Sequence, residues 1–177
     1  MLKVGVVIVG LLVPDQGQVI AFGQQRSREA DFHEVRRRVG LVFQDPDDQL
    51  FCPTVAEDIA FGPLNIGKSQ TEATAIVEHV LARLNLGGLR DRITHKLSGG
   101  EKRLVTLASV LAMKPDVLLL DEPTNALDEP NVERLIGILS GLDQAMIIIS
   151  HDPHFRKHIA TRSLRLRQGR LDPHFPE

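Results

Sequence analysis

Polar side chains with catalytic potential directly follow three apolar runs of the sequence. Asp121 and Glu122 follow VLLL, His151 closes IIISH, and Gln44 follows VGLVF. Of two carboxylates at such a place, one can hold Mg²⁺ and the other can orient or activate a water molecule. A second interpretation stays open here, because an Asp-Glu pair at the end of a strand can also cap the next helix.

A pair of glycines lies at the start of an expected helix. The stretch LSGGE runs from Leu97 to Glu101, and we expect the helix over Glu101–Met113. Free amides, the Ser98 hydroxyl and the positive end of the helix would then face an approaching anion. An ordinary capped helix start would explain Ser98 and Glu101, but not two consecutive glycines, which have poor helix propensity.

A second glycine stretch, GPLNIGKS at Gly62–Ser69, matches the phosphate-binding pattern G-x-x-x-x-G-K-[ST] at every fixed position. That pattern binds phosphate where a buried strand enters the loop and a helix leaves it. Here the preceding TVAEDIAF has apolar residues at helical spacing, and Pro63 would occupy a loop position and remove one amide. We therefore expect no phosphate site at Gly62–Ser69.

The apolar pattern predicts an α/β fold that brings the polar side chains together. VGLVF at Val39–Phe43 predicts a buried strand, and the apolar runs in DVLLLDEP and AMIIISHD are typical of parallel strands covered on both faces. Since polar residues come one step beyond each run, they should meet at one edge of the sheet, where α/β proteins place their ligands.

Helical patterns lie between these strands. Ser27 is the expected N-cap of a helix that ends in the basic cluster RRR, which we interpret as a solvated helix end. The segment TEATAIVEHVLARLNL predicts a helix with one apolar face, formed by Ala75, Ile76, Val80, Leu81 and Leu84.

Composition limits the class of protein. The chain has 177 residues, 42% of them hydrophobic, which suits one domain of ordinary size. A net charge of −2 gives no electrostatic footprint for nucleic acid, and the single cysteine, Cys52, suits a reducing compartment. The apolar N-terminal run is too short to span a bilayer, so we expect a soluble cytoplasmic protein.

Together these motifs resemble the ATP-binding cassette (ABC) ATPases that drive membrane transporters. Gln44 matches the Q-loop, LSGGE the signature, VLLLDEP the Walker B strand, NALD at Asn125–Asp128 the D-loop, and His151 the switch histidine. The wording of VGLVFQDPDDQLFCPTVAEDIAFGPLN is most similar to the cobalt/nickel-type and vitamin-type energy-coupling-factor ATPases. The resemblance runs from about Gly10 to the C-terminus.

The resemblance implies a P-loop NTPase-like (RecA-like), mostly parallel sheet with an inserted helical subdomain. Residues 1–177 would form one partial ABC ATPase domain, with 1–46 and 114–177 as the core and 47–113 as the helical subdomain. In such relatives the stretch equivalent to Gly62–Ser69 joins two helices, which makes Lys68 a loop residue and Ser69 an N-cap. The family's phosphate loop would precede Gly10, so we expect an N-terminally truncated cassette in which this loop and the first strands are missing.

The resemblance also assigns roles, with ATP and Mg²⁺ as cofactors. Glu122 would orient the attacking water, His151 would contact the γ-phosphate, Asp121 would hold the metal, and Gln44 would serve metal binding and coupling. The residues implied to face nucleotide across a head-to-tail dimer are Ser98, Gly99, Gly100, Glu101, Asn125 and Asp128. Without a phosphate loop, the chain alone is not expected to bind or hydrolyse ATP.

The implied partners are a second ATPase subunit, in a homo- or heterodimer, and a transmembrane component, with no nucleic acid. The chain would work at the cytoplasmic face of the membrane, as the ATPase of an importer for cobalt, nickel or a vitamin, docking through apolar residues near Leu50, Phe51 and Phe61. Alternatively, it would be a regulatory half-cassette that hydrolyses nothing itself. A third hypothesis, a metal site on HDPHFRKH, would use His151, His154 and His158.

Overall fold

The computed structural model describes residues 4–168 and 170–174, and Met1–Lys3 of the expected N-terminal segment lie outside this range. The elements follow in the order α1 (Val4–Ile8), β1 (Val19–Ala21), β2 (Gln24–Arg26), α2 (Glu29–Arg38), β3 (Val39–Val42), the 3₁₀ turn η1 (Pro46–Asp48), α3 (Val55–Asn65), α4 (Gln70–Arg83), the 3₁₀ turns η2 (Gly87–Leu89) and η3 (Thr94–Lys96), α5 (Gly99–Leu111), β4 (Val117–Asp121), α6 (Glu129–Ser140), β5 (Ala145–Ile149), α7 (Pro153–Ile159), β6 (Ser163–Arg167) and β7 (Arg170–His174).

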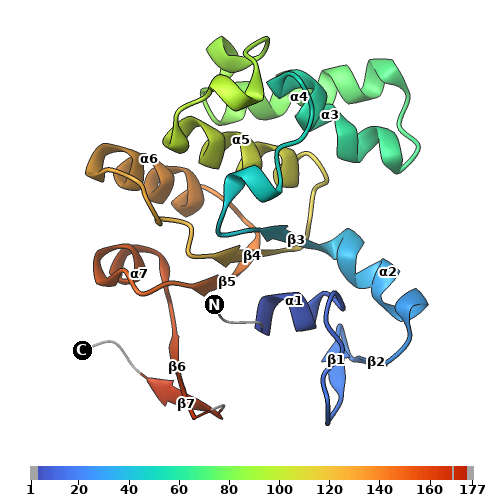
Figure 1. The fold of residues 1–177 in the computed structure, drawn as a ribbon, viewed down its shortest axis with the longest axis vertical. Coiled ribbons are helices and arrows are strands. Elements are labelled where there is room, and N and C mark those ends of the chain that lie inside the picture. The colour runs from blue at the N-terminus through green and yellow to red at the C-terminus, as the bar shows by residue number, and fades with distance from the viewer. Residues whose placement is uncertain (1–3, 169, 175–177) are drawn as a thin grey trace.

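Strands β3, β4 and β5 form a parallel sheet in that order (Figure 1). Val39 pairs with Val117, and Leu119 in turn pairs with Ile147. The predicted parallel sheet is therefore confirmed. The expectation that β4 and β5 are both covered on both faces is wrong for β5, because Ile147 is 43% exposed.

The two faces of β4 pack against different helices because side chains alternate along a strand. Leu118 and Leu120 belong to the larger apolar core, which includes buried residues of α3, α4, α5 and α6. Leu119 points into the smaller core with Phe32 of α2. Helix α1 lies close to the same face, since a Cβ added at Gly5 would stand 2.7 Å from the Leu119 side chain. The sheet thus lies between two helical layers.

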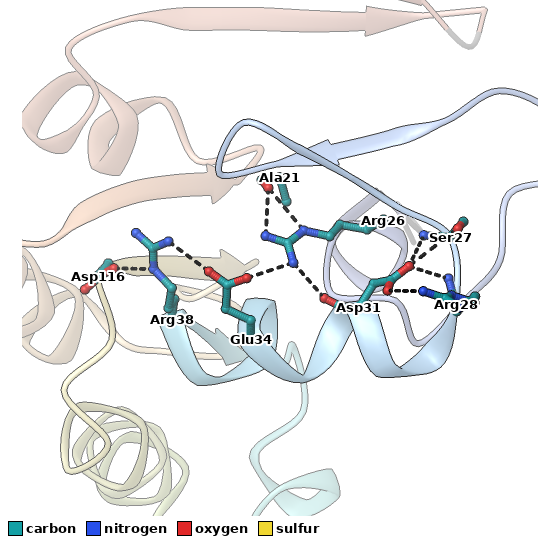
Figure 2. Close-up of polar contacts among 8 residues, drawn as sticks. All are labelled: Ala21, Arg26, Ser27, Arg28, Asp31, Glu34, Arg38 and Asp116. Atoms are coloured by element: carbon teal, nitrogen blue, oxygen red, sulfur yellow. Dashed lines mark hydrogen bonds and ion pairs between the residues drawn. The ribbon is translucent and has the colours of Figure 1, made fainter.

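A buried arginine holds the antiparallel hairpin of β1 and β2 against helix α2 (Figure 2). Arg26 is only 6% exposed, and its guanidinium donates to the carbonyl oxygens of Ala21 and Asp31, the latter at 3.0 Å. It also lies 2.8 Å from a carboxylate oxygen of Glu34.

The basic end of α2 is confirmed as a helix terminus, but it is not simply solvated. Arg38 pairs with Asp116 at 2.7 Å, in the segment that leads into β4, and with Glu34 at 3.4 Å (Figure 2). Its guanidinium also lies 3.6 Å from the ring centroid of Phe22. These contacts join the hairpin, α2 and the start of β4.

Three helix boundaries differ from expectation. The N-cap of α2 is Arg28, not Ser27, so the helix begins one residue later than expected. The Asp31 carboxylate accepts hydrogen bonds from the backbone amides of Ser27 and Arg28 and thereby stabilises this start. Pro63 lies inside α3 rather than in a loop. Helix α5 begins at Gly99 and ends at Leu111, two residues earlier at each end than expected.

The predicted apolar face of α4 is confirmed at Val80, Leu81 and Leu84, which are buried, and Ile76 packs against the same core, but Ala75 is exposed. Ala73 and Val77 are also buried on this helix. In the described ranges, no helix combines the length and the apolar character that crossing a membrane requires.

Candidate functional site

The carboxyl ends of the three parallel strands bring the expected polar side chains to one edge of the sheet. Gln44 follows the end of β3, Asp121 is the last residue of β4, and His151 follows the end of β5. A cleft of about 500 Å³ opens at this edge. Its lining consists of Val6, Phe43, Gln44, Asp45, Pro46, Asp48, Gly99, Arg103, Asp121, Asn125, Ala126 and Leu127.

Glu122 and His151 form a direct pair beside this cleft. The Nδ1 atom of His151 lies 2.8 Å from the Glu122 carboxylate, and the His151 backbone amide donates to the same oxygen at 3.3 Å. The Glu122 backbone is held by its own bond to the Ile149 carbonyl at 2.8 Å. With φ at 46°, Glu122 adopts a conformation that is uncommon for residues other than glycine and is often found at functional sites.

Asp121 lies in an environment that disfavours its charge. Burial raises the pKa of the Asp121 carboxyl above its usual value, and the neighbouring Glu122 carboxylate raises it further. The Arg103 guanidinium acts in the opposite direction and lowers this pKa. A nearby cation would therefore stabilise the ionised form of Asp121.

The turn Ser98–Gly100, called the signature turn below, opens helix α5. Ser98 is the N-cap: its hydroxyl accepts from the Glu101 amide at 3.3 Å, and the Glu101 carboxylate accepts from the Ser98 amide at 2.8 Å. The bond from the Ser98 amide lowers the pKa of Glu101 below its usual value. The Glu101 side chain is therefore occupied locally, while Ser98 and Gly99 are exposed.

The signature turn packs against the start of α6. A Cβ at Gly100 would stand 2.7 Å from the Asn131 side chain, so only glycine fits at this position without displacing Asn131. Asp128 is the N-cap of α6 and accepts from the Asn131 side chain at 2.6 Å. Since Asp128 caps this helix, the alternative that Asp121 and Glu122 are capping residues is wrong.

Three residues that contribute to this region were missed at the sequence level. Arg103 lines the cleft although it is only 2% exposed. The Gln49 side chain bonds to the Phe43 amide and the Leu41 carbonyl, at 3.1 and 3.0 Å. Asn131 was not singled out either. The signal for Arg103 lay in its spacing, because it comes four residues before the buried Leu107 and so falls on the apolar face of α5.

The pattern match at Gly62–Ser69 lies away from the cleft residues. Gly62 and Pro63 belong to α3, and Ser69 caps α4, with its hydroxyl accepting from the Glu72 amide at 3.3 Å. The Lys68 ammonium pairs with Glu72 at 2.9 Å. A helix, not a buried strand, enters this turn, as predicted.

The structure gives no support to a metal site on HDPHFRKH. His154 pairs with Glu133 of α6, and its ring contacts that of His158. His151 instead pairs with Glu122. Within residues 4–168 and 170–174, no three His, Cys, Asp or Glu side chains are grouped so that they could hold a metal ion.

Comparison with known proteins shows the family to which the chain is similar. Residues 5–125 match the family described as ABC transporter. An ABC transporter ATP-binding protein of Brucella suis biovar 1, named without a substrate, is 55% identical over 94% of this chain and 69% of its own length. The cobalt import ATP-binding protein CbiO of Rhodobacter capsulatus is 48% identical over 92% of this chain and 59% of its own length.

A solved structure agrees with these sequence matches. The CbiO1 protein of Clostridium perfringens, described as part of the ABC transporter complex CbiONQ, superposes with a TM-score of 0.85 at 32% identity. The match covers 96% of this chain and 69% of that one. The chain thus spans roughly three fifths to two thirds of these relatives. It has the P-loop NTPase fold and belongs to the ATPase family of the ABC transporters.

Proposed function

We propose that this chain is the ATP-binding part of an energy-coupling-factor importer and that the residues at the cleft edge of the sheet act on MgATP in the dimer with a second cassette subunit. The observation that carries the proposal is the grouping of Gln44, Asp121 and Asn125 around one cleft, with the Glu122–His151 pair beside it. In this scheme Glu122 orients the attacking water and His151 contacts the γ-phosphate. The signature turn acts on a nucleotide held by a second cassette subunit.

The residues at the cleft suit Mg²⁺, which prefers oxygen ligands. The Asp121 carboxylate and the Gln44 carboxamide supply such oxygens, and both residues line the cleft. Burial and the charge of Glu122 raise the pKa of Asp121, so a cation would relieve an unfavourable environment there. When bound, Mg²⁺ would neutralise charge on the phosphate oxygens.

The signature turn offers a direct test of this scheme. We would pair the chain with a full-length ABC ATP-binding subunit and measure steady-state ATP hydrolysis by the purified heterodimer. Ser98→Arg should lower the rate by about tenfold or more, because a bulky cation at the helix N-terminus blocks closure on the partner's nucleotide. Ser69→Arg, at the start of α4, is the matched control and should leave the rate unchanged. Equal rates for both variants would contradict the proposal.

A second surface supports assembly with a membrane component. Phe51 and Phe61 are 64% and 43% exposed and meet edge to face at 4.7 Å. They line an apolar groove of about 310 Å³, called the docking groove below, together with Phe43, Gln49 and Asp58. Exposed aromatic side chains around an apolar groove are typical of protein contact sites. We propose that a segment of the transmembrane subunit occupies this groove.

Co-purification tests the docking groove. Phe51→Ser should weaken recovery of the transmembrane component, because it removes apolar surface from the rim of the groove. The melting temperature of the isolated chain should change little, since Phe51 is largely exposed. Ile20→Ser, at a position of similar exposure on β1, is the matched control. Unchanged recovery with Phe51→Ser would reject this surface.

The transported substrate is proposed from resemblance alone. The name of one similar protein, the cobalt import ATP-binding protein CbiO, favours cobalt among the candidates cobalt, nickel and vitamin. Uptake of radiolabelled cobalt by cells expressing the complete transporter, with and without Glu122→Gln, would test this assignment. Uptake that does not depend on Glu122 would contradict it.

A further inference from the structure

Two consecutive basic residues of α5 contact the segment that follows β3. The Arg103 guanidinium donates to the carbonyl oxygens of Phe43, at 2.6 Å, and of Gln44. The Lys102 ammonium lies 2.6 Å from a carboxylate oxygen of Asp47, and its side chain is only 17% exposed. One turn of α5 therefore holds both ends of the segment Phe43–Asp47.

Arg103 is buried although its side chain is charged. Placing a guanidinium at 2% exposure removes it from water, which lowers its pKa, although Asp45 and Asp121 act in the opposite direction. An apolar side chain of similar length would avoid this cost. Among the described residues the Nε atom of Arg103 has no hydrogen-bond partner. What the guanidinium does provide is two bonds to a loop that has little regular structure of its own.

The loop carbonyls that Arg103 contacts belong to the site. Gln44 lines the cleft with Asp121, and Arg103 lines it as well. The signature turn opens the same helix, because Gly99 and Gly100 are its first two residues and Arg103 lies about one turn later. The backbone of Gln44 is thus tied to the helix whose N-terminus faces outward.

The segment Phe43–Asp47 is also ordered from its other side. The Gln49 side chain bonds to the Phe43 amide and to the Leu41 carbonyl, which fixes the start of the segment relative to β3. The backbone of Phe43 is therefore held by the Gln49 side chain through its amide and by α5 through its carbonyl. A displacement of α5 would pull on Gln44 through a short chain of hydrogen bonds.

We infer that Arg103, assisted by Lys102, is a positioning residue that links the position of the Gln44 backbone to the position of the signature turn. The inference deepens the proposed function and rests on it only for the meaning of the two motifs. The contacts themselves join only atoms of this chain. A shift of α5 would therefore change the placement of Gln44 at the cleft through Arg103.

Hydrogen–deuterium exchange of the full chain tests the contacts without any need for ATPase activity. Arg103→Met should accelerate amide exchange in residues 43–49 by about tenfold, while the buried strand β4 stays unchanged. Lys102→Met should give a smaller rise in the same residues. Arg83→Met, at an exposed position of α4, is the control and should change neither segment. Arg103→Lys, which keeps the charge and one possible bond, should restore part of the protection and also serves if the methionine variant folds poorly.

A second comparison separates positioning from a merely structural role. Pro46→Gly loosens η1 at its first residue, and in the wild-type background this should accelerate exchange of the Glu101 and Lys102 amides by about threefold. With Arg103→Met and Lys102→Met present, the same change should have no effect on these amides. Equal acceleration in both backgrounds, or unchanged exchange at residues 43–49 in Arg103→Met, would overturn the inference. Failure of the Ser98→Arg hydrolysis test would instead contradict the proposed function and leave this result intact.

Discussion

Helices α4 and α5 begin with the same local design in different surroundings. In α4 the Glu72 carboxylate accepts from the Ser69 amide at 2.9 Å, and in α5 the Glu101 carboxylate accepts from the Ser98 amide at 2.8 Å. The return bonds to the serine hydroxyls are 3.3 Å in both. Both are capping boxes, so the local sequence fixes a helix start in each case.

What differs is the set of neighbours. At α4, Gly67 has open space around its Cα and Lys68 pairs with the capping glutamate of its own turn. At α5, Gly100 packs against Asn131 of α6, and Arg103 reaches the loop after β3. A capping motif therefore marks a helix start, and only contacts from distant elements make one of the two starts part of a candidate site.

The largest expected effect concerns a buried acid beside α5. Asp58 is 4% exposed, lines the docking groove with Val110 of α5, and has one carboxylate oxygen without a partner among the described residues. Burial raises its pKa from 3.8 to about 6. The folded state therefore binds a proton below pH 6 that the unfolded state binds only near pH 4, and stability falls as pH rises through this window.

Asp58→Asn should remove this penalty. Denaturant unfolding at pH 8 should show the variant more stable by about 3 kcal/mol, and the gain should vanish near pH 4. Glu72, the exposed capping acid of α4, has its pKa lowered to about 2, chiefly by Lys68, so Glu72→Gln should show the opposite trend, with its loss of stability disappearing as pH falls towards 2. A pH-independent effect of Asp58→Asn would contradict the assignment.

Glycine replacements within the signature turn give the next largest effect. Gly100→Ala should destabilise the chain by about 1–3 kcal/mol, because the new methyl group displaces Asn131 from Asp128. Gly99→Ala meets open space and should instead stabilise by about 0.5–1 kcal/mol through helix propensity. Thermal unfolding of the two variants measures both. Similar shifts for both would mean that the signature turn is as free of neighbours as the start of α4.

The two serine caps, Ser98 and Ser69, should contribute equally to the free energy of unfolding but unequally to ATP hydrolysis. Ser98→Ala and Ser69→Ala should each cost about 1 kcal/mol in urea unfolding, because each removes one capping bond. In the heterodimer, only Ser98→Ala should also lower ATP hydrolysis. Equal hydrolysis rates for the two alanine variants would remove the functional difference between the two helix starts.

The smallest expected effect tests the pattern match at Gly62–Ser69. Lys68→Ala should leave ATP affinity of the heterodimer unchanged, since Lys68 pairs with Glu72 and follows a helix rather than a buried strand. Isothermal titration with MgATP measures the affinity. A tenfold loss, about 1.4 kcal/mol, would mean that this stretch does bind phosphate.

Short-range patterns predicted much of the fold and of the site. The apolar runs indicated the parallel strands β3, β4 and β5, and their ends indicated that Asp121 and His151 would meet at one edge. Motif order indicated the family. Each of these strands and motifs can be recognised from residues close together in the chain.

The remaining features depend on contacts between distant segments. Arg103 has a charged side chain, which sequence patterns assign to the surface. It is buried because Phe43 and Gln44, about 60 residues away, present their carbonyls to it. Arg26 is buried for a similar reason, under carbonyls of its own hairpin and of α2. The face of α4 was misjudged at Ala75 because the packing of α3 and α5 decides which side is covered. The roles of the site residues in ATP hydrolysis stay predictions, as does the division into core and helical subdomain.

The ion pair between Arg38 and Asp116 has a consequence for the order of folding. The two residues are 78 positions apart, and β3 and β4 start to pair directly beyond them. Closing so long a loop costs chain entropy before any strand contact is gained, whereas the contacts of α3 with α4 are local. We therefore expect the helical segment between β3 and β4 to gain structure first and the sheet to form late, so that Asp116→Ala slows refolding less than it accelerates unfolding.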